Sequence, residues 1–208
     1  KGFALFQLNK YENLNLYNYS GVTNIFNKNN TIQKVILDYG YNFFNKNIIG
    51  YINKNKNFSI NCQTNSSNFG YNLITKYIKG DIICMDEDEF RLSFSNNKDD
   101  IKKMIKDNFN FINFFKIFII TTGKKGCYFI QNKKITHVPV FREIFGDTTG
   151  CGDIFFGAVS FFKNIKELSA YDICFCSHVC AFIHGSYRGN KNQVTEENFL
   201  KLVNNLLK

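Results

Sequence analysis

The feature that most constrains the fold of this chain is a glycine-rich loop that runs directly into an apolar helix. Residues 146–153 read GDTTGCGD, and residues 154–159 read IFFGAV. The first backbone amides of a helix lack intrahelical partners and point outward at the positive end of the helix dipole. Gly150 and Gly152 leave room for a phosphate to approach the backbone, so the loop predicts an anion site.

Asp153, the last residue of this loop, lies at the mouth of the predicted anion site. A carboxylate is a poor phosphate ligand there, because the two negative charges repel each other. It is well suited to accept the proton of a hydroxyl group that attacks a phosphorus atom. The alternative interpretation is an ordinary glycine-rich turn between a strand and a helix, in which the aspartate has a capping role.

The loop resembles the C-terminal signature of the ribokinase (PfkB-type) carbohydrate kinases, written Asp-Thr-x-Gly-Ala-Gly-Asp, with Cys151 at the Ala position. The resemblance implies a three-layer α/β/α ribokinase-like fold with a mostly parallel central sheet. It also implies ATP-dependent phosphoryl transfer to a hydroxyl of a sugar or sugar phosphate. In that reaction Asp153 would be the general base, and the amides of Gly150, Cys151 and Gly152 would form the anion hole.

Composition predicts one globular domain over residues 1–208, since 44% of the residues are hydrophobic and 17% aromatic. The net charge is +9, but the lysines are scattered among asparagines, as in residues 53–57, and form no dense basic stripe. An anionic substrate such as a nucleotide or sugar phosphate accounts for this charge as well as nucleic acid does. The odd number of cysteines, 7, and the lack of an apolar run of about 18 residues predict a reducing cytoplasm and no membrane span.

Strand and helix patterns alternate along the chain, which predicts parallel strands joined by right-handed crossovers. The expected strands cover residues 35–38, 58–62, 81–85 and 115–121, followed by antiparallel strands at 127–131 and 136–140. The expected helices cover residues 43–52, 71–79, 99–109, 154–159, 171–187 and 196–207, and residues 24–34 read as a loop or frayed helix. Asp38-Tyr39-Gly40 follows the first strand and is expected to be a functional loop.

Asp86 and Glu89 open a predicted helix, and two interpretations of them stay open. Acidic residues in a first helical turn are stabilised by the helix dipole. Oxygen ligands also suit Mg²⁺, which is commonly shared with substrate phosphates. The resembling family has Asn-x-x-Glu at this point, so that Glu89 matches and Asp86 replaces Asn.

Residues 121–126 (TTGKKG) resemble the nucleotide-binding turn of the same kinases. Thr121, Gly123 and Gly126 would line the path of the nucleotide. Taken alone, the segment is also compatible with a basic hairpin turn. Its place about 21 residues before Asp147 matches the order of the family's motifs.

The predicted helix over residues 171–187 would border the adenine pocket, with Ser177 and His178 near the nucleotide and Gly189 after the helix. The alternative for His178 is a histidine of the core. The spacing Cys-x-Cys-x-His-x-Cys at residues 174–180 does not predict a metal site. On a helix Cys174 and His178 lie about 200° from Cys176 and Cys180, so one tetrahedral metal cannot collect them.

The resemblance further implies ATP and Mg²⁺ as cofactors and a monovalent-cation site at Asp147 and Thr149. Residues 38–40 and 61–66 look most like kinase domains of bifunctional sugar-activating proteins, which are similar to heptose-phosphate kinases and can carry a nucleotidyltransferase domain. Family members also have an upstream part with a Gly-Gly motif, most sugar contacts and a small β lid. This sequence shows no equivalent of that part, which predicts a truncated domain.

Two other functions remain as alternatives, and homodimer formation is left open. The first is a catalytically incomplete relic of the fold that binds a nucleotide or a partner protein. The second is a basic nucleic-acid binder, against which the scattered lysines and the lack of a recognition motif count.

Overall fold

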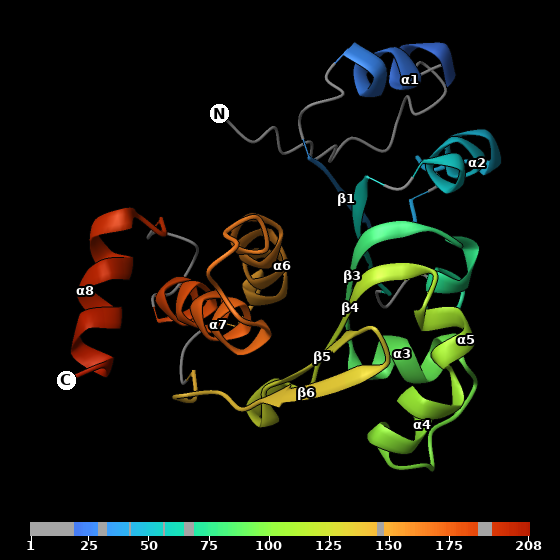
Figure 1. Ribbon diagram of the computed structural model, residues 1–208. Helices are drawn as coiled ribbons and strands as arrows, with labels where there is room; N and C mark the ends of the chain where they lie inside the picture. Colours follow the sequence, from blue (N-terminus) through green and yellow to red (C-terminus); the bar gives the residue numbers. More distant parts are fainter. Residues whose placement is uncertain are drawn as a thin grey trace. The chain divides into compact units, whose positions relative to one another are not determined.

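The computed structural model describes residues 19–28, 33–41, 43–55, 57–64, 69–144, 148–186 and 193–208. The chain forms two compact units. The first comprises Lys1–Ile119 and Ile130–Lys134, and the second Ile120–Phe129 and Ile135–Lys208. The strands of the described residues form a six-stranded sheet in the order β1-β2-β3-β4-β5-β6 (Figure 1).

The first strands of the sheet lie where the apolar runs predicted them. They are β1 (Lys34–Asp38), β2 (Phe58–Cys62), β3 (Gly80–Asp86) and β4 (Phe115–Thr121). β1 pairs with β2 and β2 with β3, both in parallel, so that Asp38 is in register with Cys62. Every residue of β2 is buried, which is typical of a parallel strand covered on both faces.

Helices of the first unit pack aromatic and aliphatic side chains against these strands. They are α1 (Tyr19–Lys28), α2 (Lys46–Lys54), α3 (Glu87–Ser93), α4 (Ile101–Asp107) and α5 (Phe109–Ile112). α3, α4 and α5 lie together beside β3 and β4 (Figure 1). Phe90 of α3 and Phe111 of α5 both contact the ring of Phe118 on β4, at centroid distances of 5.9 and 6.4 Å. α1 overlaps, over residues 24–28, the segment 24–34 that was predicted as a loop or frayed helix.

A tight hairpin joins β5 (Cys127–Gln131) to β6 (Lys134–Val138). Its two loop residues, Asn132 and Lys133, have φ angles of 51° and 61°. Two successive left-handed residues make the type I′ turn, whose twist suits an antiparallel pair. The sheet is therefore mixed, with parallel strands at β1 to β3 and an antiparallel hairpin at β5 and β6.

The helices of the second unit are α6 (Cys151–Phe162), α7 (Ala170–Gly185) and α8 (Glu196–Leu206). α6 and α7 pack against each other through the rings of Phe155 and His178, whose centroids lie 4.9 Å apart. Phe199 of α8 stacks on Phe162 at 5.5 Å. None of the helices in the described ranges has the length and apolar character needed to cross a bilayer.

The prediction of a helix over residues 71–79 is wrong. Only Ile74–Lys76 form a single 3₁₀ turn, and the backbone is extended at Leu73 and Tyr77 on either side of it. The side chains of Asn72, Lys76 and Tyr77 all reach the end of β1. On a regular α-helix residues 72 and 77 would point about 140° apart, so an extended segment is needed to bring them together.

Candidate active site

The signature loop closes into a turn at the start of α6. Gly150 is the N-terminal cap, and its φ of 78° lies in the left-handed region that favours glycine. The amide of Cys151 donates to the carbonyl of Thr148 at 3.1 Å, and the amide of Ile154 donates to the carbonyl of Gly150 at 3.0 Å. Cys151 therefore uses its amide within the turn, which corrects the expectation of three available amides. Of the three amides predicted to form the anion hole, those of Gly150 and Gly152 remain as candidates.

Space is open at Gly152, which is exposed. A Cβ atom added at Gly152 would meet no heavy atom of the described protein within 4 Å. The carboxylate of Asp153 follows in the first turn of α6 and is half-buried. An acidic side chain there is stabilised by the helix dipole. This placement agrees both with a capping role and with the role of a proton acceptor beside an anion.

His184 of α7 contacts the same turn, although no sequence motif singled it out. Its Nε2 atom lies 3.1 Å from the carbonyl oxygen of Thr149, and 35 residues separate the two. The ring also fills the space that a side chain at position 150 would need, because Nε2 would lie 3.1 Å from a Cβ added at Gly150. A contact between residues so distant in sequence leaves no local signal by which it could be found.

The predicted nucleotide turn after β4 is held by its own backbone. The amide of Thr122 donates to the carbonyl of Gly126 at 2.8 Å, and the Thr122 hydroxyl donates to the same oxygen at 3.0 Å. Gly123 and Gly126 have positive φ angles of 56° and 97°. A Cβ atom added at Gly126 would lie only 2.0 Å from the carbonyl oxygen of Val138. The turn is therefore a fixed structure, and Thr121 precedes it as the last residue of β4.

Ser177 and His178 of α7 lie within the packing of the second unit. The Ser177 hydroxyl is fully buried and donates to the carbonyl of Ile173 in its own helix at 2.7 Å. His178 lies against Phe155. Hydrogen bonding with Cys174 and with His178 lowers the pKa of the buried Cys127 thiol. This packing agrees with the core alternative given for His178, and the nucleotide contacts of Ser177 and His178 stay predictions.

Asp86 and Glu89 form a capping box at the start of α3. Asp86 Oδ1 accepts a hydrogen bond from the amide of Glu89 at 2.7 Å, and Glu89 Oε2 accepts one from the amide of Asp86 at 2.9 Å. The other oxygen of Glu89 accepts from the amide of Thr64 at 2.9 Å. Both carboxylates already serve the backbone at the start of α3, which agrees with the capping interpretation. A Mg²⁺ role for them stays a prediction.

The structure describes only some of the remaining residues that were predicted to bind a cation or the nucleotide. Asp147 and Gly189 lie outside the described residues, whereas Thr149 lies in the exposed turn before α6. Among the residues that the structure does describe, no three His, Cys, Asp or Glu side chains come together so as to hold a metal ion. Asp86 and Glu89 belong to the first unit, and the loop from Thr149 to Asp153 belongs to the second.

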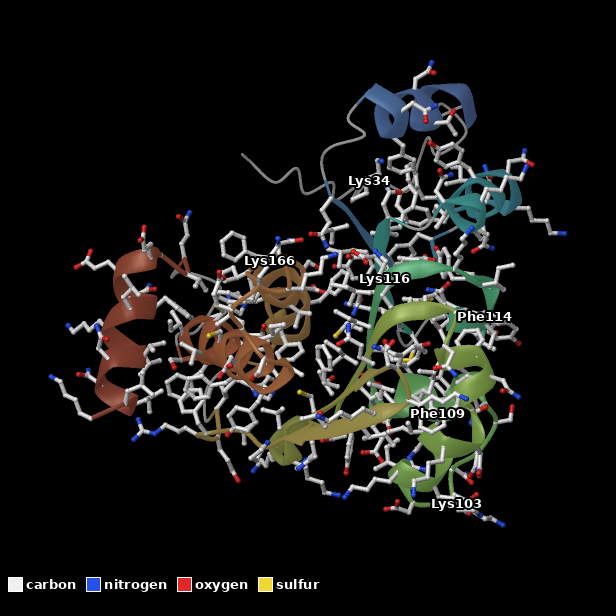
Figure 2. All side chains as sticks on the ribbon, viewed as in Figure 1. Lys34, Lys103, Phe109, Phe114, Lys116 and Lys166 are labelled. Carbon is white, nitrogen blue, oxygen red and sulfur yellow. The ribbon has the colours of Figure 1, made fainter. Side chains whose placement is uncertain are left out.

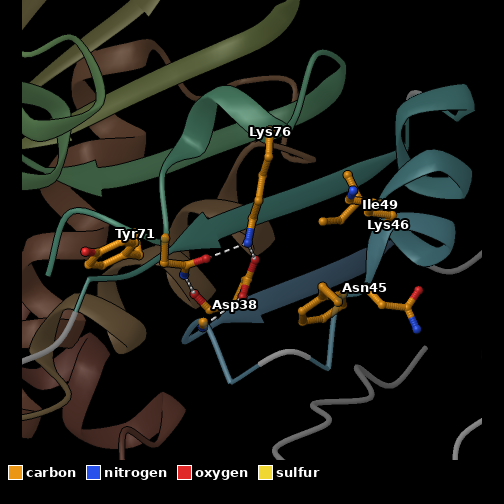
Figure 3. Close-up of a pocket in the computed structure, with 9 residues that line it drawn as sticks. Asp38, Asn45, Lys46, Ile49, Tyr71 and Lys76 are labelled. Atoms are coloured by element: carbon orange, nitrogen blue, oxygen red, sulfur yellow. Dashed lines mark hydrogen bonds and ion pairs between the residues drawn. The ribbon is translucent and has the colours of Figure 1, made fainter. Parts of the chain in front are cut away.

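Asp38 is the centre of a polar cluster in the first unit. Its buried carboxylate accepts hydrogen bonds from the Tyr77 hydroxyl at 2.6 Å and the Gly40 amide at 3.0 Å, and it forms an ion pair with Lys76 (Figure 3). Burial and the charge of Asp38 raise the pKa of the Tyr77 hydroxyl well above its ordinary value. A cavity of about 440 Å³ opens beside Asp38, between the end of β1, the start of α2 and residues 71–76. The sequence pointed to Asp38, but not to its partners.

Three lysines in the described part of the first unit lie apart from one another. Lys34, Lys103 and Lys116 extend from β1, α4 and β4 at separate places (Figure 2). Lys103 is paired with Asp99 and Lys116 with Asp81, each at 3.1 Å. Paired and dispersed lysines offer little of the continuous positive surface that nucleic-acid binding requires.

The fold and the loop before α6 define an α/β protein in which a glycine in the left-handed conformation caps the N-terminus of an apolar helix. The sequence model of the pfkB family of carbohydrate kinases matches residues 49–192, and the chain belongs to this family. A comparison with curated protein sequences finds no match.

Solved structures of kinases share the fold. The ribokinase of Thermotoga maritima has a TM-score of 0.64 and 17% identity, over 84% of this chain and 59% of that one. The ribokinase of Giardia lamblia has a TM-score of 0.66 and 16% identity, over 89% of this chain and 63% of that one. Phosphofructokinase-2 of Escherichia coli in complex with potassium has a TM-score of 0.64 and 12% identity, over 92% of this chain and 63% of that one. The chain thus has a ribokinase-like fold and spans about 59–63% of the length of these proteins.

Proposed function

We propose that this chain carries the phosphoryl-transfer part of an ATP-dependent carbohydrate kinase that acts on a hydroxyl of a sugar or sugar phosphate. The observation that supports this most is the start of α6. There Gly150 caps the helix in a left-handed conformation, Gly152 has open space at its α-carbon, and Asp153 lies in the first turn. Membership of the pfkB family makes this arrangement a candidate site for phosphoryl transfer.

In the proposed reaction Asp153 accepts the proton of the attacking hydroxyl. The amides of Gly150 and Gly152 stabilise the negative charge on the transferred phosphoryl group. The rigid turn over residues 121–126 is proposed to guide the nucleotide. ATP would bring Mg²⁺ on its phosphates, which supplies charge neutralisation, and the capping box of Asp86 and Glu89 is proposed to contact the ion through water.

Replacement of the proposed base tests this mechanism directly. Asp153→Asn keeps the size of the side chain and removes the proton acceptor, and loss of a general base typically lowers the rate by about 10²–10⁴. The assay follows transfer of the labelled γ-phosphoryl group from ATP to a panel of aldoses, ketoses and their phosphates in the full-length protein. The panel includes heptose phosphates because residues 38–40 resemble those of heptose-phosphate kinases. Undiminished transfer by Asp153→Asn would exclude the proposed role.

A second pair of variants tests the anion hole separately from stability. Gly152→Ala adds a methyl group where the protein leaves open space, so folding is expected to be unchanged. The same methyl group would obstruct the approach of a phosphate, so ATP turnover should fall. Gly157→Ala, also in α6 and also without a neighbour within 4 Å, is the matched control and should keep full activity. Equal activity of the two variants would contradict a phosphate at Gly152.

Binding and turnover must be measured on the same sample, because a relic of the fold would bind without catalysis. Calorimetry with ATP and Mg²⁺ measures binding, and the transfer assay measures turnover. Binding accompanied by transfer to one member of the panel supports the kinase. Binding without transfer to any member favours a protein that only holds the nucleotide.

A further inference from the structure

A histidine on α7 controls one peptide group of the proposed anion hole. His184 Nε2 lies 3.1 Å from the carbonyl oxygen of Thr149. A carbonyl oxygen only accepts hydrogen bonds, so Nε2 must carry the hydrogen. The ring also packs against Gly150, where a Cβ atom would lie 3.1 Å from Nε2.

The carbonyl of Thr149 and the amide of Gly150 belong to the same peptide group. This group is planar and trans, so its C=O and N–H bonds point in opposite directions. A donor that holds the carbonyl oxygen on the side of α7 therefore turns the amide of Gly150 to the opposite side. The hydrogen bond between the Cys151 amide and the Thr148 carbonyl, at 3.1 Å, fixes the other end of the turn. His184 thus determines the direction of one of the two amides on which the proposed anion hole depends.

The monovalent cation expected at Asp147 and Thr149 does not suit this arrangement. The carbonyl oxygen of Thr149 has two lone pairs, and the N–H of His184 uses one of them. A cation on the other lone pair would lie close to the positive end of this N–H bond, and the two would repel each other. Asp147 lies outside the described residues, so the imidazole N–H is the partner that the structure gives to this oxygen.

We propose that His184 is a positioning residue that holds the Thr149–Gly150 peptide in place of a bound monovalent cation. The phosphate-binding consequence rests on the proposed function, whereas the positioning itself does not. The proposal predicts that His184 has its hydrogen on Nε2 and that potassium leaves the turn unchanged. It also predicts that loss of the donor, and not of ring volume, weakens nucleotide binding.

The first measurement needs no nucleotide. The chain has 3 histidines, so ¹⁵N-histidine spectra of the full-length protein can be assigned with a variant at each position. We expect His184 to carry its hydrogen on Nε2, and the Gly150 amide signal to move in His184→Leu but not when potassium replaces tetramethylammonium at constant ionic strength. A hydrogen on Nδ1 alone, or a Gly150 signal that follows potassium in the wild type, would overturn the proposal.

The second measurement compares His184→Leu with His184→Gln, whose side-chain amide can still donate to Thr149. The probe is a non-hydrolysable ATP analogue with Mg²⁺. His184→Leu should bind it about 3- to 10-fold more weakly, as loss of one hydrogen bond implies, and His184→Gln should recover most of the affinity. A purely structural role would instead lower thermal stability in both variants and leave affinity unchanged, which would refute the proposal. If the wild type binds no analogue, the proposed function fails, and the spectra still decide whether His184 positions the turn.

Discussion

The hydroxyl of Tyr77 donates a hydrogen bond of 2.6 Å to Asp38, and 39 residues separate the two. Both side chains are buried. Asp38 ends β1, while Tyr77 follows the 3₁₀ turn between β2 and β3. One hydrogen bond therefore joins the edge strand of the sheet to a segment that has no regular structure of its own.

Tyr77→Phe removes this bond and leaves the rest of the ring in place. We expect a loss of about 1.5–3 kcal/mol in the free energy of unfolding, the range for a hydrogen bond to a charged group. Urea denaturation measures it. Tyr71→Phe is the control, because Tyr71 is 90% exposed and its hydroxyl should contribute little. Equal stability of the two variants would show that the buried hydroxyl contributes no more than an exposed one.

Gly126→Ala should be among the most damaging single-methyl changes in the nucleotide turn. The added Cβ would lie 2.0 Å from the carbonyl oxygen of Val138, at a φ of 97° that alanine rarely adopts. We expect a loss of more than about 3 kcal/mol, because both backbone segments would have to move. Gly157→Ala, within α6, should instead be neutral or stabilise the fold by up to about 1 kcal/mol. Thermal unfolding of both variants checks the contrast, and a small effect at Gly126 would contradict the rigid turn.

The capping box of α3 can be separated from a metal role by two changes at one position. Asp86→Asn keeps an oxygen that accepts from the Glu89 amide, so stability should change by less than about 0.5 kcal/mol. Asp86→Ala removes the acceptor and should cost about 0.5–2 kcal/mol. Chemical denaturation measures both. The Mg²⁺ concentration that gives half-maximal phosphoryl transfer provides the second readout, since a water-mediated metal contact would raise it in Asp86→Asn.

Lys163 should make stability depend on pH above neutrality. Burial lowers the pKa of its ammonium group from 10.5 to about 8 in the folded protein. Between about pH 8 and 10.5 the unfolded chain therefore binds more protons at this residue than the folded protein, so Lys163 makes stability rise with pH across that window. Lys163→Met should remove this contribution, whereas Lys166→Met, at an exposed position, should leave it. Denaturation curves at about pH 7.5, 8.5 and 9.5 give the slope of stability against pH for the wild type and both variants; identical slopes for all three proteins would contradict the assignment.

Much of the fold could be predicted because apolar runs and turn residues are local signals. The strands Phe58–Cys62 and Phe115–Thr121 begin and end where their hydrophobic runs do. The prediction for residues 71–79 was wrong, because the spacing of their apolar residues fits a helix while Asn72, Lys76 and Tyr77 form hydrogen bonds or an ion pair with Asp38. Tertiary hydrogen bonds, which the sequence pattern does not contain, overrode local preference there.

In the candidate site too, local features could be predicted from the sequence, whereas contacts between distant residues could not. The start of a helix at this loop follows from the motif, since an apolar run follows the glycines directly, and Gly150 supplies the left-handed cap. The motif did not show that the amide of Cys151 would be used inside the turn. It also gave no indication of His184, because a contact across 35 residues depends on how α6 and α7 pack.

The side-chain amide of Asn72 donates to two carbonyl oxygens, that of Asp38 at 2.9 Å and that of Gln63 at 2.8 Å. Asp38 ends β1 and Gln63 directly follows β2, the strand that pairs with β1 in parallel. The two ends consequently cannot fray one at a time. In hydrogen exchange they should open in a single cooperative event, and any change in the length of either loop must preserve the spacing that one amide group can bridge.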